Sequence, residues 1–175
     1  MNSKEVASDV PKISSVGMDD IDEMRTLASE IWHRHYADII GTAQIDYMLA
    51  QRYSPDVLCA ELMRNDLWWD QLLIAGCMRG FASYFLNAGA AGMKLDKLYI
   101  HHEQQRKGYG RLMLTRVETV ARRNSSRRLT LAVNKKNHGA IAAYEKYGFR
   151  TVDAVVKDIG DGFVMDDYIM VKQIG

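Results

Sequence analysis

The stretch Leu98–Leu114 (LYIHHEQQRKGYGRLML) constrains the fold of this chain more than any other part of the sequence. It opens with Leu98–Ile100, which has the residue types of a β-strand. The polar segment His101–Lys107 that follows is too hydrophilic for a protein core. Beyond it, apolar residues recur at the three- and four-residue intervals of an amphipathic helix. The stretch therefore predicts a strand, a polar turn and a helix that begins at two glycines, Gly108 and Gly110.

The two glycines at the predicted helix start indicate an anion site. A helix N-terminus leaves backbone N–H groups unpaired and carries the positive end of the helix dipole, and glycines let an anion come close to those groups. A nucleotide-triphosphate loop would continue with Lys and Ser or Thr, whereas Arg111 and Leu112 follow here. The dinucleotide fingerprint would need a third glycine where Met113 stands. A phosphate or pyrophosphate ligand outside these two classes remains.

A second stretch has the same strand-to-helix character. Arg128–Val133 (RLTLAV) is typical of a strand, and the polar turn NKKN follows it. The next residues, HGAIAAYEKYGF, predict an alanine-rich helix that ends at Gly148. The order of the two stretches is strand, polar turn, helix, then strand, polar turn, helix.

Both stretches resemble the GCN5-related N-acetyltransferase (GNAT) family. Gln105–Gly110 (QRKGYG) is similar to the family's Q/R-x-x-G-x-G/A loop, which holds the pyrophosphate of coenzyme A. The second helix matches the family pattern at Asn137, Ala140, Tyr144, Gly148 and Phe149. The resemblance covers roughly residues 71–174. It implies the acetyltransferase fold, an α/β domain with a mixed, mainly antiparallel sheet flanked by helices.

Length and composition agree with one ordinary globular domain. The chain has 175 residues, of which 47% are hydrophobic and 26% charged, with a net charge of +1. We expect a flexible segment at residues 1–10 and a single domain at 11–175. The small net charge excludes a strong global attraction to nucleic acid or to a membrane. Two cysteines, Cys59 and Cys77, predict no disulfide framework and favour a cytoplasmic location.

The remaining elements follow from local patterns. Apolar spacing from Ile21 predicts a first helix, and Ser54 and Pro55 are typical of the cap and first position of a later one. Two hairpins are expected, and the Asp-Gly turn before the last strand is typical of the second. Their strands are predicted at 71–75, 79–86, 150–157 and 164–172. We expect the last of these, Val164–Lys172, to be an edge strand through which two copies can form a homodimer.

The resemblance also implies how coenzyme A is held. The backbone amides of Arg106–Arg111 are expected to bind the pyrophosphate, with charge added by Lys107 and Arg111. A backbone N–H on a bulged central strand, near Ile100 with Tyr99 beside it, is expected to polarise the thioester carbonyl. The predicted cofactor-binding residues are Tyr99, Ile100, Gln105, Arg106, Lys107, Gly108, Tyr109, Gly110, Arg111, Asn137 and Tyr144.

Tyr144 is the expected partner of the leaving thiolate. Thiols titrate near about 8.5 and phenols near about 10, so a tyrosine can stabilise or protonate a thiolate. Asn137 lies two helical turns before it, and we expect it to hydrogen-bond the cofactor arm. Tyr147, one turn further on, is interpreted as a packing residue.

The acceptor amine must lose a proton before it reacts, because an amine of pKa ~10.4 is almost entirely charged at pH 7. Asp96, Glu103, His101 and His102 are the candidate bases. Strand alternation places Asp96 on the same face as Leu98, which makes it either a catalytic group or an edge charge. Adjacent strand residues point to opposite faces and no third ligand is evident, so His101 and His102 predict a solvated loop and no metal site.

The acceptor pocket is the least constrained part of the chain. The resemblance implies a pocket between the first helices and the last hairpin, with the candidates Trp32, His35, Tyr36, Tyr47, Asp166, Asp167 and Tyr168. The arginines near 122–128 lack interleaved stacking aromatics, which argues against RNA binding. The sequence therefore predicts direct acetyl transfer from acetyl-CoA to a primary amine of a small molecule or peptide. The alternatives are a catalytically silent acyl-CoA-binding or regulatory module on the same fold and a nucleic-acid binder.

Overall fold

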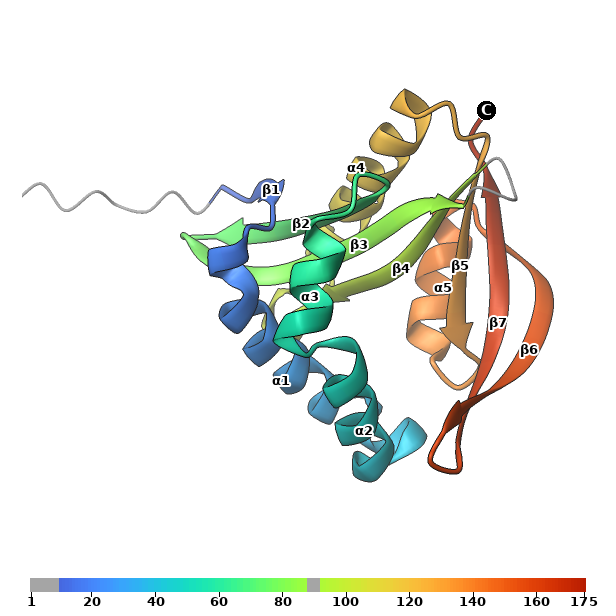
Figure 1. Cartoon of the computed structure of the whole chain (residues 1–175). Helices are drawn as coiled ribbons and strands as arrows, with labels where there is room; N and C mark the ends of the chain where they lie inside the picture. Colours follow the sequence, from blue (N-terminus) through green and yellow to red (C-terminus); the bar gives the residue numbers. More distant parts are fainter. Residues whose placement is uncertain (1–9, 88–91) are drawn as a thin grey trace, which may run out of the picture.

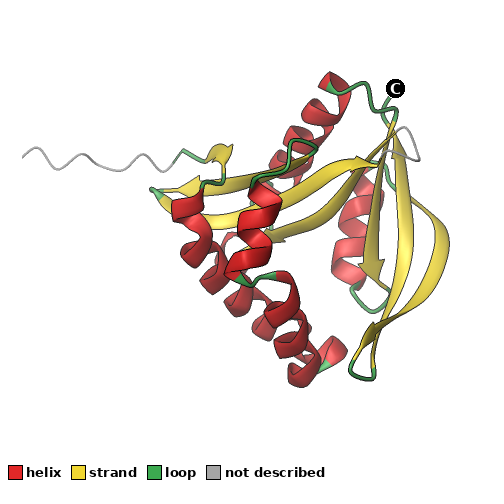
Figure 2. Ribbon diagram, in the orientation of Figure 1, coloured by secondary structure: helices red, strands yellow, loops and turns green. Residues whose placement is uncertain are grey.

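A seven-stranded mixed sheet organises the molecule, with helices on both of its faces (Figure 1, Figure 2). The structure is a computed structural model that describes residues 10–87 and 92–175, so most of the segment 1–10, expected to be flexible, lies outside the described residues. The strands are β1 (Lys12–Ser15), β2 (Leu67–Ile74), β3 (Cys77–Asn87), β4 (Gly92–Ile100), β5 (Arg128–Asn134), β6 (Arg150–Gly160) and β7 (Phe163–Gln173). The helices are α1 (Ile21–Ile40), α2 (Thr42–Arg52), α3 (Pro55–Leu62), α4 (Tyr109–Arg123) and α5 (His138–Tyr147), with short 3-10 turns η1 (Met18–Asp20) and η2 (His102–Gln104).

The strand order is β1-β2-β3-β4-β5-β7-β6, and β4 and β5 form the one parallel pair among these neighbours. This confirms the predicted fold class, an α/β domain with a mainly antiparallel sheet. No helix in the described ranges combines the length and the apolar character that crossing a membrane requires.

Each face of the sheet has its own apolar core. The first core joins α4 and α5 to the sheet and contains Tyr84, Met113, Val117, Leu131 and Phe149. The second joins α1, α2 and α3 to the opposite face and contains Met24, Trp32, Ile45, Leu58 and Phe81. These side chains are at most 5% exposed, so the helical and strand periodicities of the sequence are satisfied on both faces.

Local signals in the sequence account for several element boundaries. The Ser54 side chain accepts a hydrogen bond from the backbone N–H of Val57, and Pro55 is the first residue of α3, as predicted. Gly148 ends α5 in the left-handed conformation, with φ of 105°. The β6–β7 hairpin turns at Asp161 and Gly162, which both have positive φ, so the predicted Asp-Gly turn is confirmed.

The position of the last strand differs from the prediction. β7 pairs with β5 on one side and with β6 on the other, so it lies inside the sheet. The edge strand on this side of the sheet is β6, whose side chains are almost all exposed, including Val152 and Val156. The expectation of an edge at Val164–Lys172 was wrong because chain order does not fix strand order: β7 inserts between β5 and β6.

β4 and β5 separate part of the way along their length. Their parallel pairing covers Met93–Leu95 against Leu129–Leu131 and then stops (Figure 1). Beyond that point β4 stays paired with β3, whereas β5 stays paired with β7. The sheet therefore opens toward the carboxyl ends of β4 and β5, and we call this opening the splay.

A β-bulge lies where the splay begins. Ser83 on β3 faces Lys97, but the next residue, Tyr84, faces Leu95, so Asp96 has no partner on β3. The extra residue changes which side chains share a face. Asp96 contacts Arg52 of α2, whereas Leu98 packs against the core of α4 and α5. The predicted common face of these two residues was wrong because alternation breaks at a bulge.

Candidate active site

The N-terminus of α4 presents a run of unused backbone donors. Gly108 precedes the helix with φ of 87°, and Arg106 also has a positive φ, of 61°. The first backbone bond into the helix runs from Leu112 N to Gly108 O over 3.0 Å. Within the described residues, the N–H groups of 106–111 have no hydrogen-bond acceptor. These donors and the helix dipole make the segment suited to a phosphate group.

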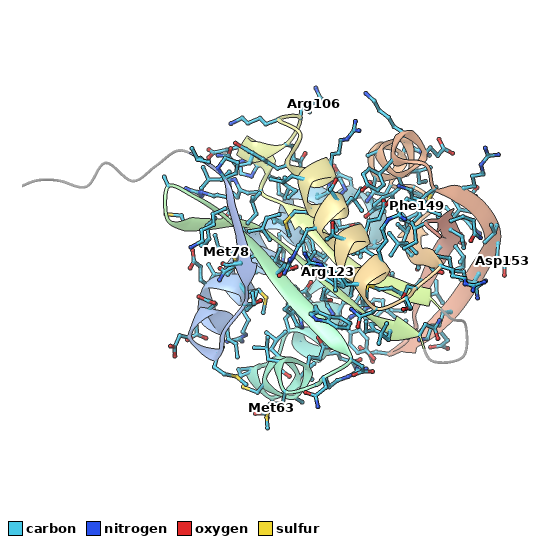
Figure 3. The ribbon with its side chains drawn as sticks, turned by 90° about the horizontal axis from the view of Figure 1, so that it is seen from above. Met63, Met78, Arg106, Arg123, Phe149 and Asp153 are labelled. Carbon is cyan, nitrogen blue, oxygen red and sulfur yellow. The ribbon has the colours of Figure 1, made fainter. Side chains whose placement is uncertain are left out.

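The fold itself does not demand a glycine at position 110. A Cβ built on Gly110 meets no atom within 4 Å, and the residue has no positive φ. Room above the backbone there fits the close approach of a pyrophosphate, which is the fit expected of a coenzyme A loop. The Arg106 side chain extends outward from the molecule (Figure 3). Gln105 donates from Nε2 to the carbonyl of Ile100 over 3.1 Å, so this loop is attached to the end of β4.

The register of β3 and β4 shows which backbone groups face the splay. His101 N donates to Arg79 O over 2.8 Å, so these residues form a hydrogen-bonded antiparallel pair. Pairs alternate along such a ladder, and Ile100 opposite Gly80 and Leu98 opposite Ala82 are therefore non-hydrogen-bonded pairs. The N–H groups of Leu98 and Ile100 consequently point away from β3, toward the side where β5 has diverged.

Tyrosine side chains from three elements meet beside the splay. Tyr36 comes from α1, Tyr99 from β4 and Tyr144 from α5. The ring centroids of Tyr36 and Tyr99 are 6.4 Å apart, and both rings pack near Trp32. Burial raises the pKa of all three phenols above the usual value, and for Tyr144 the neighbouring Tyr36 adds to the rise. All three hydroxyls therefore stay protonated at neutral pH.

The Tyr144 hydroxyl is free of internal hydrogen bonds in the described part of the chain. Its ring packs edge-on against Phe149, with centroids 5.7 Å apart, which fixes the ring while leaving the hydroxyl uncommitted. Tyr147 differs, because its hydroxyl donates to the Thr115 side chain and Lys172 Nζ lies 4.0 Å from its ring centroid. The interpretation of Tyr147 as a packing residue agrees with these contacts.

Asn137 has a structural use that the sequence did not reveal. It is the N-cap of α5, and its Oδ1 accepts from Ala140 N over 3.3 Å. The same oxygen lies 3.2 Å from His35 Nε2, and Nδ2 donates to the Tyr36 hydroxyl over 3.2 Å. Asn137 is 5% exposed, so its amide connects α5 to the end of α1 rather than pointing freely toward a cofactor arm.

Asp167 places a buried carboxylate beside the same group of side chains. It lies on β7 opposite Asn134, the last residue of β5, and is 7% exposed. Its Oδ1 is buried and has no hydrogen-bond partner among the described residues. Burial and the neighbouring Asp166 raise the pKa of this carboxyl, and its charge raises the pKa of Tyr36. Such a group can accept a proton or hold a cation.

Asp96 has the environment of an ion-pair partner and not of a base. Its carboxylate accepts from Arg52 Nη2 over 2.8 Å and from Lys97 Nζ over 2.6 Å. Burial alone would raise its pKa, but the charges of Lys97 and Arg52 lower it to about 2. A carboxylate of that pKa takes up a proton poorly at neutral pH. The geometry gives Asp96 the role of fixing the bulge against α2.

The other predicted site residues have contacts of their own. The Tyr47 hydroxyl donates to Ile159 O over 2.7 Å, and Lys135 lies over the ring of Tyr168. The Glu103 side chain is 65% exposed. His101, expected in a solvated loop, is instead 4% exposed, with Nε2 2.8 Å from Glu30 Oε1.

Arg52 and Glu30 are the two residues that the sequence analysis missed. Arg52 contacts Asp96 across 44 residues of the chain, and Glu30 contacts His101 across 71 residues. Both reach their partners from a helix. No local spacing or propensity signals such a contact. A buried acid on a strand and a buried histidine each require a partner, and that requirement was the one signal available.

The sequence of the chain matches a known protein family and a characterised relative. Residues 21–149 match the family model described as "Acetyltransferase (GNAT) family". The chain is 24% identical over 159 residues to the spermidine N(1)-acetyltransferase of Thermoplasma acidophilum, an alignment that covers 89% of this chain and 95% of the relative.

Solved structures share the fold. The PaiA N-acetyltransferase of Thermoplasma acidophilum, solved in complex with coenzyme A, has a TM-score of 0.83 and 24% identity, and the match covers 94% of this chain and 99% of that one. The ribosomal-protein-S18-alanine N-acetyltransferase of Escherichia coli has a TM-score of 0.71 and 20% identity, with 95% of both chains covered.

The Asp96 ion pair generates a prediction about stability and pH. We expect Asp96→Asn to lower the free energy of unfolding at pH 7 by about 2 kcal/mol, because a shift from 3.8 to about 2 is worth ~1.36 kcal/mol per unit. The folded-state pKa lies below the unfolded one, so this contribution is complete above about pH 4 and is lost as the pH falls through 2. Urea unfolding at a series of pH values measures it.

Asp66→Asn is the matched control, because Asp66 also pairs with an arginine, Arg64, but in an exposed position. We expect little change in this variant. Equal stability losses at pH 7 and pH 2 in Asp96→Asn would contradict the assignment.

Proposed function

The chain belongs to the acetyltransferase (GNAT) family, and from this premise we propose that it transfers an acetyl group from acetyl-CoA directly to a primary amine of a small molecule or peptide. The observation that carries the proposal is the meeting of two sets of unused backbone donors. The N–H groups of Leu98 and Ile100 face the splay, and the N–H groups of 106–111 lie at the α4 N-terminus, which Gln105 attaches to Ile100.

Acetyl-CoA supplies an acetyl group that its thioester has already activated. The residues of this chain hold it through the amides of 106–111, which suit a pyrophosphate, with charge from Lys107 and Arg111. Lys107 is exposed and its Nζ donates to Gln104 Oε1 over 3.0 Å, so its ammonium lies near the loop.

The Ile100 N–H is the proposed donor to the carbonyl oxygen of the acetyl group. It faces the splay and belongs to a strand that is held by β3, so it needs no reorganisation when charge develops on that oxygen. A preorganised donor of this kind contributes roughly 2.7–4 kcal/mol to transition-state stabilisation. Tyr99 supports the strand from the opposite face, where its ring packs against Phe81.

Tyr144 is the proposed hydrogen-bond donor to the departing thiolate. Its raised pKa keeps the proton on the phenol, so the hydroxyl stabilises the thiolate without full proton transfer. The absence of a competing partner among the described residues leaves the hydroxyl available.

Asp167 is the proposed acceptor of the proton that the amine must lose. A pKa raised by burial brings a carboxyl closer to neutral pH, which improves it as a general base. The same carboxylate attracts an ammonium group before reaction. The acceptors to test first are aliphatic polyamines, since the Thermoplasma relative is a spermidine N(1)-acetyltransferase.

The two cysteines of this chain agree with direct transfer, in which no enzyme thiol carries the acetyl group. Cys59 on α3 and Cys77 at the start of β3 are free, and within the described residues neither forms a hydrogen bond with a histidine. An activated cysteine nucleophile would need such a base or another source of positive charge.

Acetyl-CoA binding can be tested by thermal unfolding. A ligand at ~100 times its dissociation constant stabilises a protein by ~2.7 kcal/mol, which for this size is a rise of roughly 5–10 °C in the midpoint. We expect acetyl-CoA to produce the rise and AMP and NADH to produce none. In Gly110→Glu we expect a more stable free protein but a smaller rise with acetyl-CoA, because a carboxylate favours a helix N-terminus and repels a pyrophosphate.

Gly139→Glu is the matched control, because Gly139 is also the second residue of a helix and a Cβ there also meets no atom within 4 Å. It should gain stability and keep the full rise. An undiminished rise in Gly110→Glu, or no rise in the original chain, would contradict the proposed loop.

Replacement of Tyr144 tests catalysis separately from binding. We expect Tyr144→Phe to lower kcat by roughly 10²-fold or more, with an unchanged dissociation constant for acetyl-CoA, because the ring remains and only the donor is lost. Thiol release with spermidine as acceptor measures the rate. Tyr147→Phe should retain the original rate, and an equal rate in Tyr144→Phe would exclude the proposed role of Tyr144. Binding of acetyl-CoA without thiol release in the original chain would leave the silent acyl-CoA-binding module as the better description.

Replacement of Asp167 tests its proposed role as the base that takes the proton of the amine. We expect Asp167→Asn to lower kcat/KM for the amine by roughly 10²-fold with acetyl-CoA affinity unchanged. Its folded-state pKa is raised, so the original carboxyl destabilises the fold increasingly as the pH rises from the unfolded value through the folded one. The amide should therefore increase stability at pH 7. Unchanged kcat/KM would exclude Asp167 as the base.

A further inference from the structure

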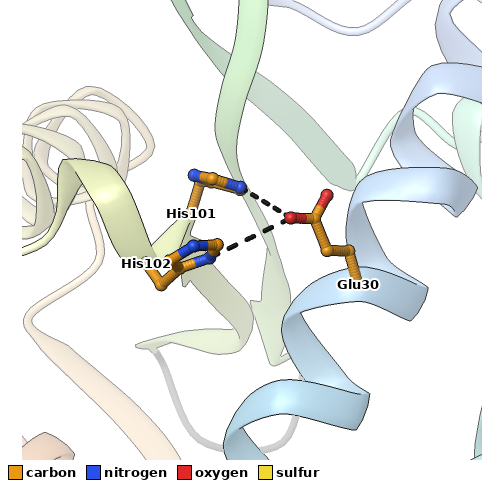
Figure 4. Close-up of side chains that lie close together, drawn as sticks. All are labelled: Glu30, His101 and His102. Carbon is orange, nitrogen blue, oxygen red and sulfur yellow. Dashed lines mark hydrogen bonds and ion pairs between the residues drawn. The ribbon is translucent and has the colours of Figure 1, made fainter.

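Glu30, His101 and His102 form a compact cluster outside the proposed acetyl-transfer residues (Figure 4). Glu30 comes from α1, His101 follows β4 and His102 opens η2. One ligand atom from each residue lies within 4.8 Å of the other two. Glu30 Oε1 is 2.8 Å from His101 Nε2 and 4.0 Å from His102 Nδ1.

The structure contradicts both grounds on which the sequence argued against a metal here. The two histidines do not point to opposite faces, since β4 ends at Ile100 and the chain then turns into η2. Their ring centroids are 4.1 Å apart, and both rings face Glu30 (Figure 4). The third ligand, which no local pattern shows, is supplied by α1.

One atom of the cluster lacks a partner. His102 Nδ1 is buried and has no hydrogen bond among the described residues, although it lies on the side of Glu30. A buried ring nitrogen without a partner is costly, and either a proton shared with a carboxylate or a metal ion would satisfy it. The cluster thus has one strong contact, between His101 and Glu30, and one incomplete contact.

We propose that Glu30, His101 and His102 bind one divalent transition-metal ion, for which Zn²⁺ suits the donor set best. Two imidazoles and a carboxylate form a three-ligand zinc set that leaves a fourth position for water. Zinc lies about 2.0–2.2 Å from such ligands, so tetrahedral donor atoms are roughly 3.3 Å apart. The contacts of 2.8 Å and 4.0 Å lie on either side of that value, and all three ligand atoms lie within 4.8 Å of one another, so shifts of roughly 1–1.5 Å bring them to it.

Near the cluster, the charge of Glu103 favours a bound cation and the charge of Arg79 opposes it. His101 Nδ1 accepts from the backbone N–H of Glu103 over 3.3 Å, and the Glu103 carboxylate lies 3.9 Å from the same nitrogen. When Nε2 binds a metal, the ring proton moves to Nδ1, which then gives up the bond from the Glu103 backbone N–H and donates a hydrogen bond to the Glu103 carboxylate instead. Arg79 acts on Glu30 as a nearby positive charge and weakens the attraction for a cation.

A bound ion would connect α1 to the turn that leads into Gln105–Gly110. His102 is three residues before Gln105, so the ion would fasten the polar segment at the end of β4. It would bind the folded chain and not the separated ligands of the unfolded one, and would therefore raise the thermal midpoint.

Calorimetric titration of the full chain, first freed of metal with a chelator, tests the site with Zn²⁺ and with Co²⁺. We expect about one ion per chain, a higher thermal midpoint, and the visible absorption of four-coordinate Co²⁺. Glu30→Gln and His102→Gln should each weaken Zn²⁺ binding at least about tenfold. Glu30 is half exposed, so its variant should fold, and its metal-free midpoint checks this.

His138→Gln and Cys77→Ser are the controls, because both residues are exposed and each can bind zinc by itself. Both should keep the affinity of the original chain. The proposal is overturned if no saturable binding occurs, if Glu30→Gln binds as tightly as the original chain, or if Cys77→Ser abolishes binding. The cluster would then be only a hydrogen bond between His101 and Glu30.

Discussion

The separation of β4 from β5 after Leu95 is the constraint on which the rest of the structure depends. Two parallel strands that diverge leave backbone donors and acceptors unpaired inside a sheet, which is costly, so other contacts must stabilise the divergence. Here the bulge at Asp96 fixes it, because the carboxylate of the extra residue is bound by Arg52 from α2 and by Lys97. Loss of one partner of such a pair would leave the other charge uncompensated, so the pair holds the bulge in place.

The splay also explains why three separate elements close around one place. α1 brings Tyr36 to it, α5 begins beside it at Asn137, and β7 brings Asp167 to the end of β5. The hydrogen bond from Asn137 to Tyr36 joins two of these elements across the opening. The order β5-β7-β6 matters for the same reason, since an edge position for β7 would remove Asp167 from the site.

Much of the fold was predictable because neighbouring residues determine where helices and turns begin and end. The start of α4 at Gly108, the Ser54 cap and the Asp-Gly hairpin each follow from the conformational preferences of a few neighbouring residues. The fold class followed from the order of such segments. The errors arose where contacts between distant parts of the chain determine the position of a side chain. The bulge moved Asp96 to the other face, and Glu30 contacts His101 across 71 residues. Strand alternation and helical spacing carry no information about such contacts.

The polar groups around the splay separate into two kinds, and this separation indicates where the chemistry lies. The side chains of Asn137 and Asp96 are fully engaged with other parts of the fold, so they hold elements in place. Asp167 Oδ1 is buried without a hydrogen-bond partner in the described ranges, which is costly, and the Tyr144 hydroxyl also has no partner there. A fold retains an uncompensated polar group most readily where a ligand compensates for it, and active sites are where such groups gather. The proposed amine acetylation would give each group a partner of the right charge, a thiolate for Tyr144 and an ammonium for Asp167.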